Sequence, residues 1–194
     1  MRRHEEPRGQ TLVEFALVFP IFILLIVGLI EFSLAFNALL SVNFASRDAA
    51  LLAAEAGEDQ GSDCVILSSI DADVQPPASR VRISSVRIYW ADSQGAELAA
   101  NVYSRTGALT CILPDNSTVT VPYTLQGGSN YPENERCSVL AGCPEDPGHT
   151  ELDNIGVSIT YAYSWVTPMA QMITLGGTGF TLTHANVMRM EPVL

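Results

Sequence analysis

Residues 9–30 have the sequence GQTLVEFALVFPIFILLIVGLI, and this stretch decides how the rest of the chain can be arranged. No charged residue occurs from Phe15 to Ile30, and only Pro20 and Gly28 interrupt a run of large aliphatic and aromatic residues. A short head with three arginines precedes the run, and one carboxylate, Glu14, lies near its start. Because a charge at the centre of a membrane helix costs about 2.5–3.5 kcal/mol on insertion scales, Glu14 is expected to have a specific partner.

The length of this run favours a membrane anchor. It exceeds the apolar core of a secretory signal peptide, which has about 7–15 residues. A single span needs about 20 residues, and residues 15–36 supply them if Glu31 lies near the outer boundary. The arginines precede the span, whereas acidic residues follow it. This bias predicts a single-pass protein of the cytoplasmic membrane, with its N-terminus in the cytoplasm and its C-terminal domain outside.

Past Glu31 the helical pattern becomes amphipathic. One side carries a polar stripe, made of Ser33, Asn37 and Ser41. The other side is apolar, with Phe32, Phe36, Leu39 and Leu40. Gly57 is the expected stop, so the helix would be about 70 Å long at 1.5 Å per residue. A bilayer core takes about 30 Å of this length, and the remainder is expected to pack on a C-terminal β-domain. Pro20 either kinks the helix or is tolerated as a membrane proline.

The C-terminal part shows strand periodicity. Residues 81–90 alternate with a bulge or break at Ser84-Ser85, and residues 154–165 alternate strictly. Further strands are expected at residues 108–113, 117–125 and 180–190, and residues 96–103 fit either a helix or a strand. Residues 58–63 are expected to form a linker and residues 126–153 a long surface loop. Residues 167–175 are expected to form a short helix capped at its start. The predicted fold class is α+β: a long N-terminal transmembrane and amphipathic helix packed on a small antiparallel β-sheet domain, as in pilins.

The glycine followed by four residues and then Glu-Phe, ahead of a long apolar helix, resembles the processing site of type IV pilin-like proteins. The longer segment RGQTLVEFALVFP, residues 8–20, resembles the N-terminus of TadE/TadG-like proteins, minor pseudopilins of the tight-adherence (Tad/Flp) pilus machinery. The resemblance implies that a prepilin peptidase cleaves after Gly9 and leaves Gln10 first. Major type IV pilins usually begin with Phe instead. Three regions follow: a leader (1–9), the helix (10–57) and an extracytoplasmic β-rich domain (58–194).

The resemblance also implies a role in subunit assembly for Glu14, Phe15 and Pro20. In an assembly, the Glu14 carboxylate would pair with the freed N-terminal amine of a neighbouring subunit, and a paired charge tolerates burial better than a lone one. The alternative is that Glu14 is solvated at headgroup depth. Glu31 is expected to be a boundary residue rather than a second intersubunit contact. The implied partners are the membrane, the prepilin peptidase and other pilin-like subunits, and the implied role is initiation or tip formation in adhesion or secretion.

Four cysteines, Cys64, Cys111, Cys137 and Cys143, all follow the apolar helix. An even number in a segment predicted to be exported indicates disulfides, and three connectivities are possible. We favour Cys137–Cys143, which closes a small loop, together with Cys64–Cys111. Four unpaired buried thiols are the other interpretation. The cysteine and histidine spacings do not fit a zinc site, so no metal or cofactor is expected.

The formal net charge of −11 argues against nucleic acid as a partner. The histidines, His4, His149 and His184, do not fall in a catalytic motif, so neither an enzyme activity nor a small-molecule substrate is predicted. The alternative function is an uncleaved, single-pass, membrane-anchored binding module whose β-domain recognises an extracellular ligand. An anchored enzyme that uses His149 is a third, disfavoured, possibility.

Overall fold

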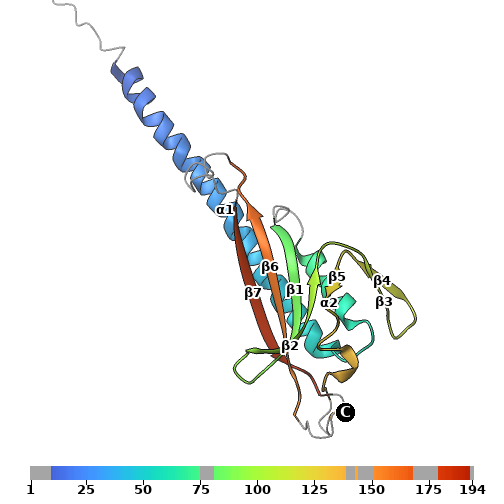
Figure 1. The fold of residues 1–194 in the computed structure, drawn as a ribbon. Helices are drawn as coiled ribbons and strands as arrows, with labels where there is room; N and C mark the ends of the chain where they lie inside the picture. The colour runs from blue at the N-terminus through green and yellow to red at the C-terminus, as the bar shows by residue number, and fades with distance from the viewer. Residues whose placement is uncertain (1–9, 75–80, 139–142, 144–150, 168–178, 193–194) are drawn as a thin grey trace, which may run out of the picture.

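The computed structural model describes residues 10–74, 81–138, 143, 151–167 and 179–192. Its first element is one continuous helix, α1 (Gln10–Ala56), which runs through Pro20. The N-terminal part of α1 extends far beyond the rest of the molecule, and its C-terminal part lies along the sheet (Figure 1). The helix ends just before Gly57, where a Cβ would lie 2.3 Å from the backbone carbonyl oxygen of Ala53 and 2.7 Å from the Cε of Met190. The predicted stop at Gly57 is therefore correct, and the close approach of the Ala53 carbonyl explains the need for glycine.

The face of α1 that packs on the domain is built from small side chains. It consists of Ala38, Val42, Ala45, Ala49 and Ala53, each at most 1% exposed. Small residues let the helix backbone lie close to the sheet at the packing density of a protein interior. On the side of α1 that is apolar in sequence, Phe32 and Phe36 do not pack on the domain, because they are 69% and 51% exposed. The large aromatic side chains of this segment point away from the domain.

A five-stranded antiparallel sheet forms the body of the domain, in the order β5-β2-β1-β6-β7. Its strands are β1 (Val81–Ala91), β2 (Glu97–Ser104), β5 (Thr124–Gln126), β6 (Asn154–Ser164) and β7 (Gly179–Arg189). Helix α1 lies against β6 and β7 (Figure 1). The main core lies on this side of the sheet and joins α1 residues to the isoleucines and valines of β1 and β6. The α+β fold class predicted from the sequence is correct.

The irregularity predicted in the first strand is a β-bulge. Strand β1 continues through Ser84, but its register with β6 shifts between Ile83 and Ser85. The Ser84 hydroxyl donates a hydrogen bond to the carbonyl oxygen of Thr160, at 2.9 Å. Side chains alternate between the two faces of a strand, so Ile83 and Val86 would point to opposite faces without an inserted residue. With the bulge, both lie in the main core.

Helix α2 (Ser62–Asp73), which follows the turn at residues 57–61, was not predicted from the sequence. Its buried Cys64, Leu67 and Ile70 recur every three residues and face the core. Helix α2 packs against α1 and against a separate hairpin of β3 (Leu109–Ile112) and β4 (Thr118–Val121). The single strand predicted at residues 117–125 is in fact two strands, β4 and β5, which belong to different sheets.

Residues 126–153 were predicted to be a surface loop, and the structure corrects this for the described part. Tyr131, Arg136 and Cys137 are 4%, 1% and 0% exposed, and a short 3-10 helix, η2 (Glu133–Glu135), lies between them. A polar composition suggested exposure, but here the polar groups are paired with one another inside the domain. The short helix predicted after Thr167 lies outside the described residues.

Candidate assembly surface on helix α1

The N-terminal part of α1 is apolar and uncovered. All residues from Thr11 to Ile30 are exposed except Val27, which is half-exposed. Phe15 is 64% exposed, and its ring contacts that of Phe19 in a tilted arrangement, with centroids 5.2 Å apart. By length and composition, α1 can cross a membrane. An apolar helix without cover in its own chain is suited to lipid or to other apolar helices.

Three predicted site residues, Glu14, Phe15 and Pro20, lie on this segment, and two, Gly9 and Gln10, precede it. Pro20 is in the middle of the exposed part of α1, and Glu14 is exposed one turn after the start of the helix. Glu14 precedes Phe32 by eighteen positions, which is about five turns, so the two side chains project from the same side of the helix. Since Phe32 points away from the domain, Glu14 also faces outward. Gln10 is the first residue of α1, and Gly9 lies outside the described residues.

Glu31 has partners within its own chain that the sequence did not reveal. It is only 5% exposed, and its carboxylate accepts hydrogen bonds from the backbone N–H groups of Val166 and Thr167, at 2.7 and 2.8 Å. The hydroxyl of Tyr163 lies 3.5 Å from the same carboxylate. The cost of burying the carboxylate is offset by these donors. Glu31 therefore fastens the segment after β6 to α1, at the point where the helix leaves the domain.

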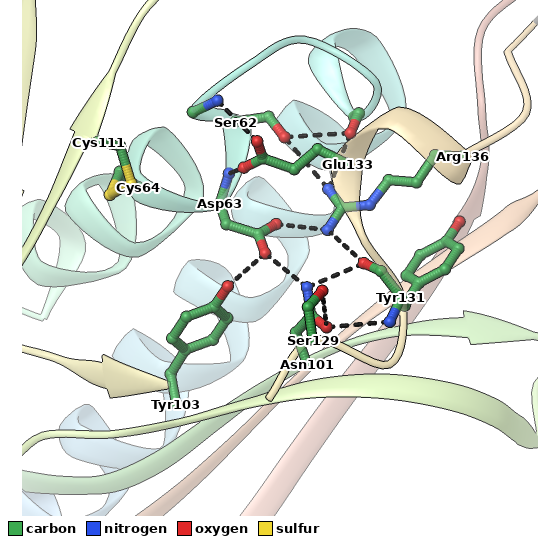
Figure 2. A network of polar contacts seen from close by, with 12 residues as sticks. Ser62, Asp63, Cys64, Asn101, Tyr103, Cys111, Ser129, Tyr131, Glu133 and Arg136 are labelled. Carbon is green, nitrogen blue, oxygen red and sulfur yellow. Dashed lines mark hydrogen bonds and ion pairs between the residues drawn. A yellow bond between two sulfur atoms is a disulfide. The ribbon is translucent and has the colours of Figure 1, made fainter. Parts of the chain in front are cut away.

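A buried ion pair organises the opposite end of the domain (Figure 2). The Arg136 guanidinium lies 2.6 Å from the Asp63 carboxylate, with the side chains 0% and 4% exposed. Arg136 also donates to the carbonyl oxygen of Gly57 at 2.8 Å, which ties the end of α1 to this group. Asp63 accepts further hydrogen bonds from the Tyr103 hydroxyl at 2.5 Å and from Asn101 at 2.9 Å.

The chemistry of this network is structural. Burial, reinforced by the neighbouring Asp63 carboxylate, raises the pKa of Tyr103, so its hydroxyl stays protonated and acts as a donor. The Glu133 carboxylate accepts the N–H groups of Gly61 and Asp63 at 2.8 and 2.9 Å, and so satisfies the first turn of α2. These residues join α1, α2, β2 and η2. These residues are far apart in the chain, so the sequence did not reveal that they meet, and the polarity of residues 126–138 indicated an exposed loop instead.

Both favoured disulfides are present in the structure. Cys64 in α2 is bonded to Cys111 in β3, with Cα atoms 6.1 Å apart, and Cys137 is bonded to Cys143, with Cα atoms 5.1 Å apart. The first bond links the β3-β4 hairpin to the helical layer, and the second closes a loop beside the buried Arg136. Each fixes a segment that lies outside the five-stranded sheet.

Comparison with known proteins bears on the N-terminal segment. The family model of the TadE-like proteins matches residues 9–51, which include the exposed apolar part of α1 and most of its packing face. This match confirms the resemblance seen in the sequence. No curated protein and no solved structure matches the chain. The C-terminal domain is therefore interpreted from its own structure.

Proposed function

We propose that this chain is a minor pseudopilin, a structural subunit that takes part in initiating or capping a Tad/Flp-type pilus. The observation that carries the proposal is the exposed apolar segment from Thr11 to Ile30 within a region that matches the TadE-like family model. The packed core of the domain does not need this apolar helix segment, which is about 30 Å long. A large exposed apolar surface marks a contact site, so we expect lipid or other helices to cover it.

The proposed assembly follows from how the two parts of α1 differ. One side of α1 from Val42 to Ala54 belongs to the core of the chain's own domain, whereas residues 11–30 are exposed and can contact neighbours. In the membrane, lipid covers residues 11–30; in the assembly, the corresponding helices of other pilin-like subunits replace the lipid. The carboxylate of Glu14 then pairs with the amine of Gln10 on an adjacent subunit. Extraction into the assembly leaves the acidic C-terminal domain in solvent.

Processing after Gly9 is the step on which this proposal depends. We expect the intact mass of the protein from membranes to lack residues 1–9 when the prepilin peptidase is present and to be full-length when it is absent. Gly9→Val should block the loss. Gly28→Ala is a matched control, because a Cβ at Gly28 has no neighbour within 4 Å and the substitution leaves the leader unchanged.

The same measurement also reports the state of the new N-terminus. An N-terminal glutamine can lose ammonia and cyclise, which would remove the amine that Glu14 needs. A mature mass with an intact Gln10 amine supports the proposed pairing. Full-length protein in both membrane samples would contradict processing and favour the uncleaved, anchored binding module.

A further inference from the structure

Three aromatic rings form a cluster at the end of the domain next to the exposed part of α1. Tyr163 lies in β6, Trp165 just after it, and Phe180 at the start of β7. The rings of Tyr163 and Phe180 stack with centroids 5.2 Å apart, and Trp165 meets them edge-on at 5.7 and 5.3 Å. Tyr163 is buried, whereas Trp165 and Phe180 remain partly exposed. We call these three residues the aromatic cluster.

The position of the aromatic cluster along α1 is fixed by Glu31. Its carboxylate holds the backbone of Val166 and Thr167, the residues directly after Trp165. The end of β6 and the start of β7 lie beside α1 where the helix leaves the domain (Figure 1). The cluster is therefore level with Glu31, the residue that follows the exposed apolar segment.

The length of that segment matches a bilayer. The twenty residues from Thr11 to Ile30 span about 30 Å in a helix, which is the thickness of the hydrocarbon core. When this segment crosses the membrane, Glu31 and the aromatic cluster reach the headgroup layer on the outer side. Phe32 and Phe36 add two more exposed rings on α1 close to this level. Their rings stack with centroids 6.2 Å apart.

We propose that the aromatic cluster, together with Phe32 and Phe36, is a lipid-contacting surface that sits in the outer headgroup layer and sets the height of the domain above the membrane. The inference rests on the membrane anchoring in the proposed function. Tryptophan and tyrosine concentrate at membrane interfaces because their rings are apolar at one end and polar at the other. The cluster adjoins α1 at Glu31, where the Tyr163 hydroxyl lies 3.5 Å from the carboxylate, and Glu31 directly follows the apolar segment, so a bilayer whose outer boundary lies at Glu31 reaches the cluster.

This surface has a consequence for assembly. Glu31 joins the cluster to α1, so the domain and the membrane helix are held as one body and the domain is not connected by a free tether. Glu14 precedes Glu31 by seventeen residues, or about 26 Å along the helix. A domain held at the outer headgroups therefore places Glu14 just inside the inner boundary, within reach of the end of a neighbouring chain.

The two tryptophans of the chain provide a test with an internal control. Trp165 belongs to the aromatic cluster, whereas Trp90 pairs with Ile155 at the opposite end of the sheet. The full chain is reconstituted in phosphatidylcholine vesicles that carry bromine on the acyl chains, either near the headgroup or near the bilayer centre. Trp90→Phe leaves Trp165 as the reporter, and Trp165→Phe leaves Trp90. A third variant places a tryptophan in the apolar segment, Phe22→Trp, in a chain with both native tryptophans replaced.

We expect shallow bromine to reduce Trp165 emission about twofold, with a weaker effect of deep bromine and none on Trp90. The Phe22→Trp reporter should respond most to deep bromine. If that reporter is quenched but Trp165 is not, the result supports membrane anchoring by α1 and contradicts lipid contact by the aromatic cluster. A second subunit that covers the cluster would give this result. Quenching of Trp165 mainly by deep bromine would also overturn the proposed depth. If neither responds, the membrane anchoring in the proposed function fails as well.

Discussion

At the scale of single residues, Glu14 and Glu31 occupy opposite environments on one helix. Glu14 is exposed and faces away from the domain, whereas Glu31 is buried and held by backbone N–H groups of the same chain. The sequence distinguished them by the family resemblance around Glu14. It did not reveal the partners of Glu31, because Val166 and Thr167 are 135 and 136 positions away.

Glu14→Gln is expected to abolish assembly without affecting folding. The substitution keeps the size of the side chain but removes the charge that attracts a neighbouring amine. Glu14 is exposed and remote from the core, so the free energy of unfolding in detergent should change by less than about 0.5 kcal/mol. Co-purification of the mature chain with other pilin-like subunits measures assembly. Normal co-purification of the variant would show that the Glu14 charge is dispensable.

Arg136→Met is expected to destabilise the protein by about 3–5 kcal/mol, because it leaves the buried Asp63 carboxylate without its cation. Combining it with Asp63→Asn should recover part of the loss. Arg87→Met removes a comparable pair with Glu97 whose side chains are 39% and 35% exposed, so it should cost only about 0–1 kcal/mol. Denaturant unfolding of the four proteins measures the difference. Equal losses for the two arginines would contradict a structural role for the buried network.

At the scale of elements, the helices and strands that have a clear local periodicity were predicted from the sequence. Features that depend on partners far away in the chain were not. The extent of α1, the bulge in β1 and strands β6 and β7 were predicted correctly because each has a regular period or a clear stop. Helix α2 was missed because serine, aspartate and β-branched residues give it a weak helix preference. The sequence did not show which side of α1 packs on the domain, and close contact with the sheet selects alanines there rather than the largest apolar residues. Helix periodicity alone does not say which apolar stripe is covered.

Two neighbouring substitutions separate the faces of α1. Ala45→Leu adds volume at a site that is 0% exposed, so it should cost about 1–3 kcal/mol through overpacking against the domain. Phe44→Ala removes a ring that is 64% exposed and should leave the free energy of unfolding within about 0.5 kcal/mol of the wild type. Unfolding midpoints in detergent measure both. A large loss for Phe44→Ala with none for Ala45→Leu would mean that the aromatic side packs inward.

At the scale of the whole molecule, the proposed regions 10–57 and 58–194 divide the sequence, but one core crosses the boundary between them. Val42, Ala49 and Ala53 lie in the same cluster as the core residues of β1 and β6. Beyond this apolar contact, the backbone N–H of Glu191 donates to the carbonyl oxygen of Ala54 at 2.9 Å. The outer half of α1 is therefore part of the domain's folding unit, and only the segment before Glu31 is separable.

Two fragments test this division. Residues 31–194 retain Glu31 and the alanine face and lose the exposed apolar segment, so we expect a soluble fragment that unfolds cooperatively. Residues 58–194 lose one wall of the core and the Gly57 carbonyl that Arg136 binds, so they should show no cooperative transition, although both disulfides can still form. Near-ultraviolet circular dichroism during denaturant titration measures both. A cooperative transition for residues 58–194 would instead show that the domain folds without α1. The height of the domain above the membrane would then not be set by rigid packing on α1.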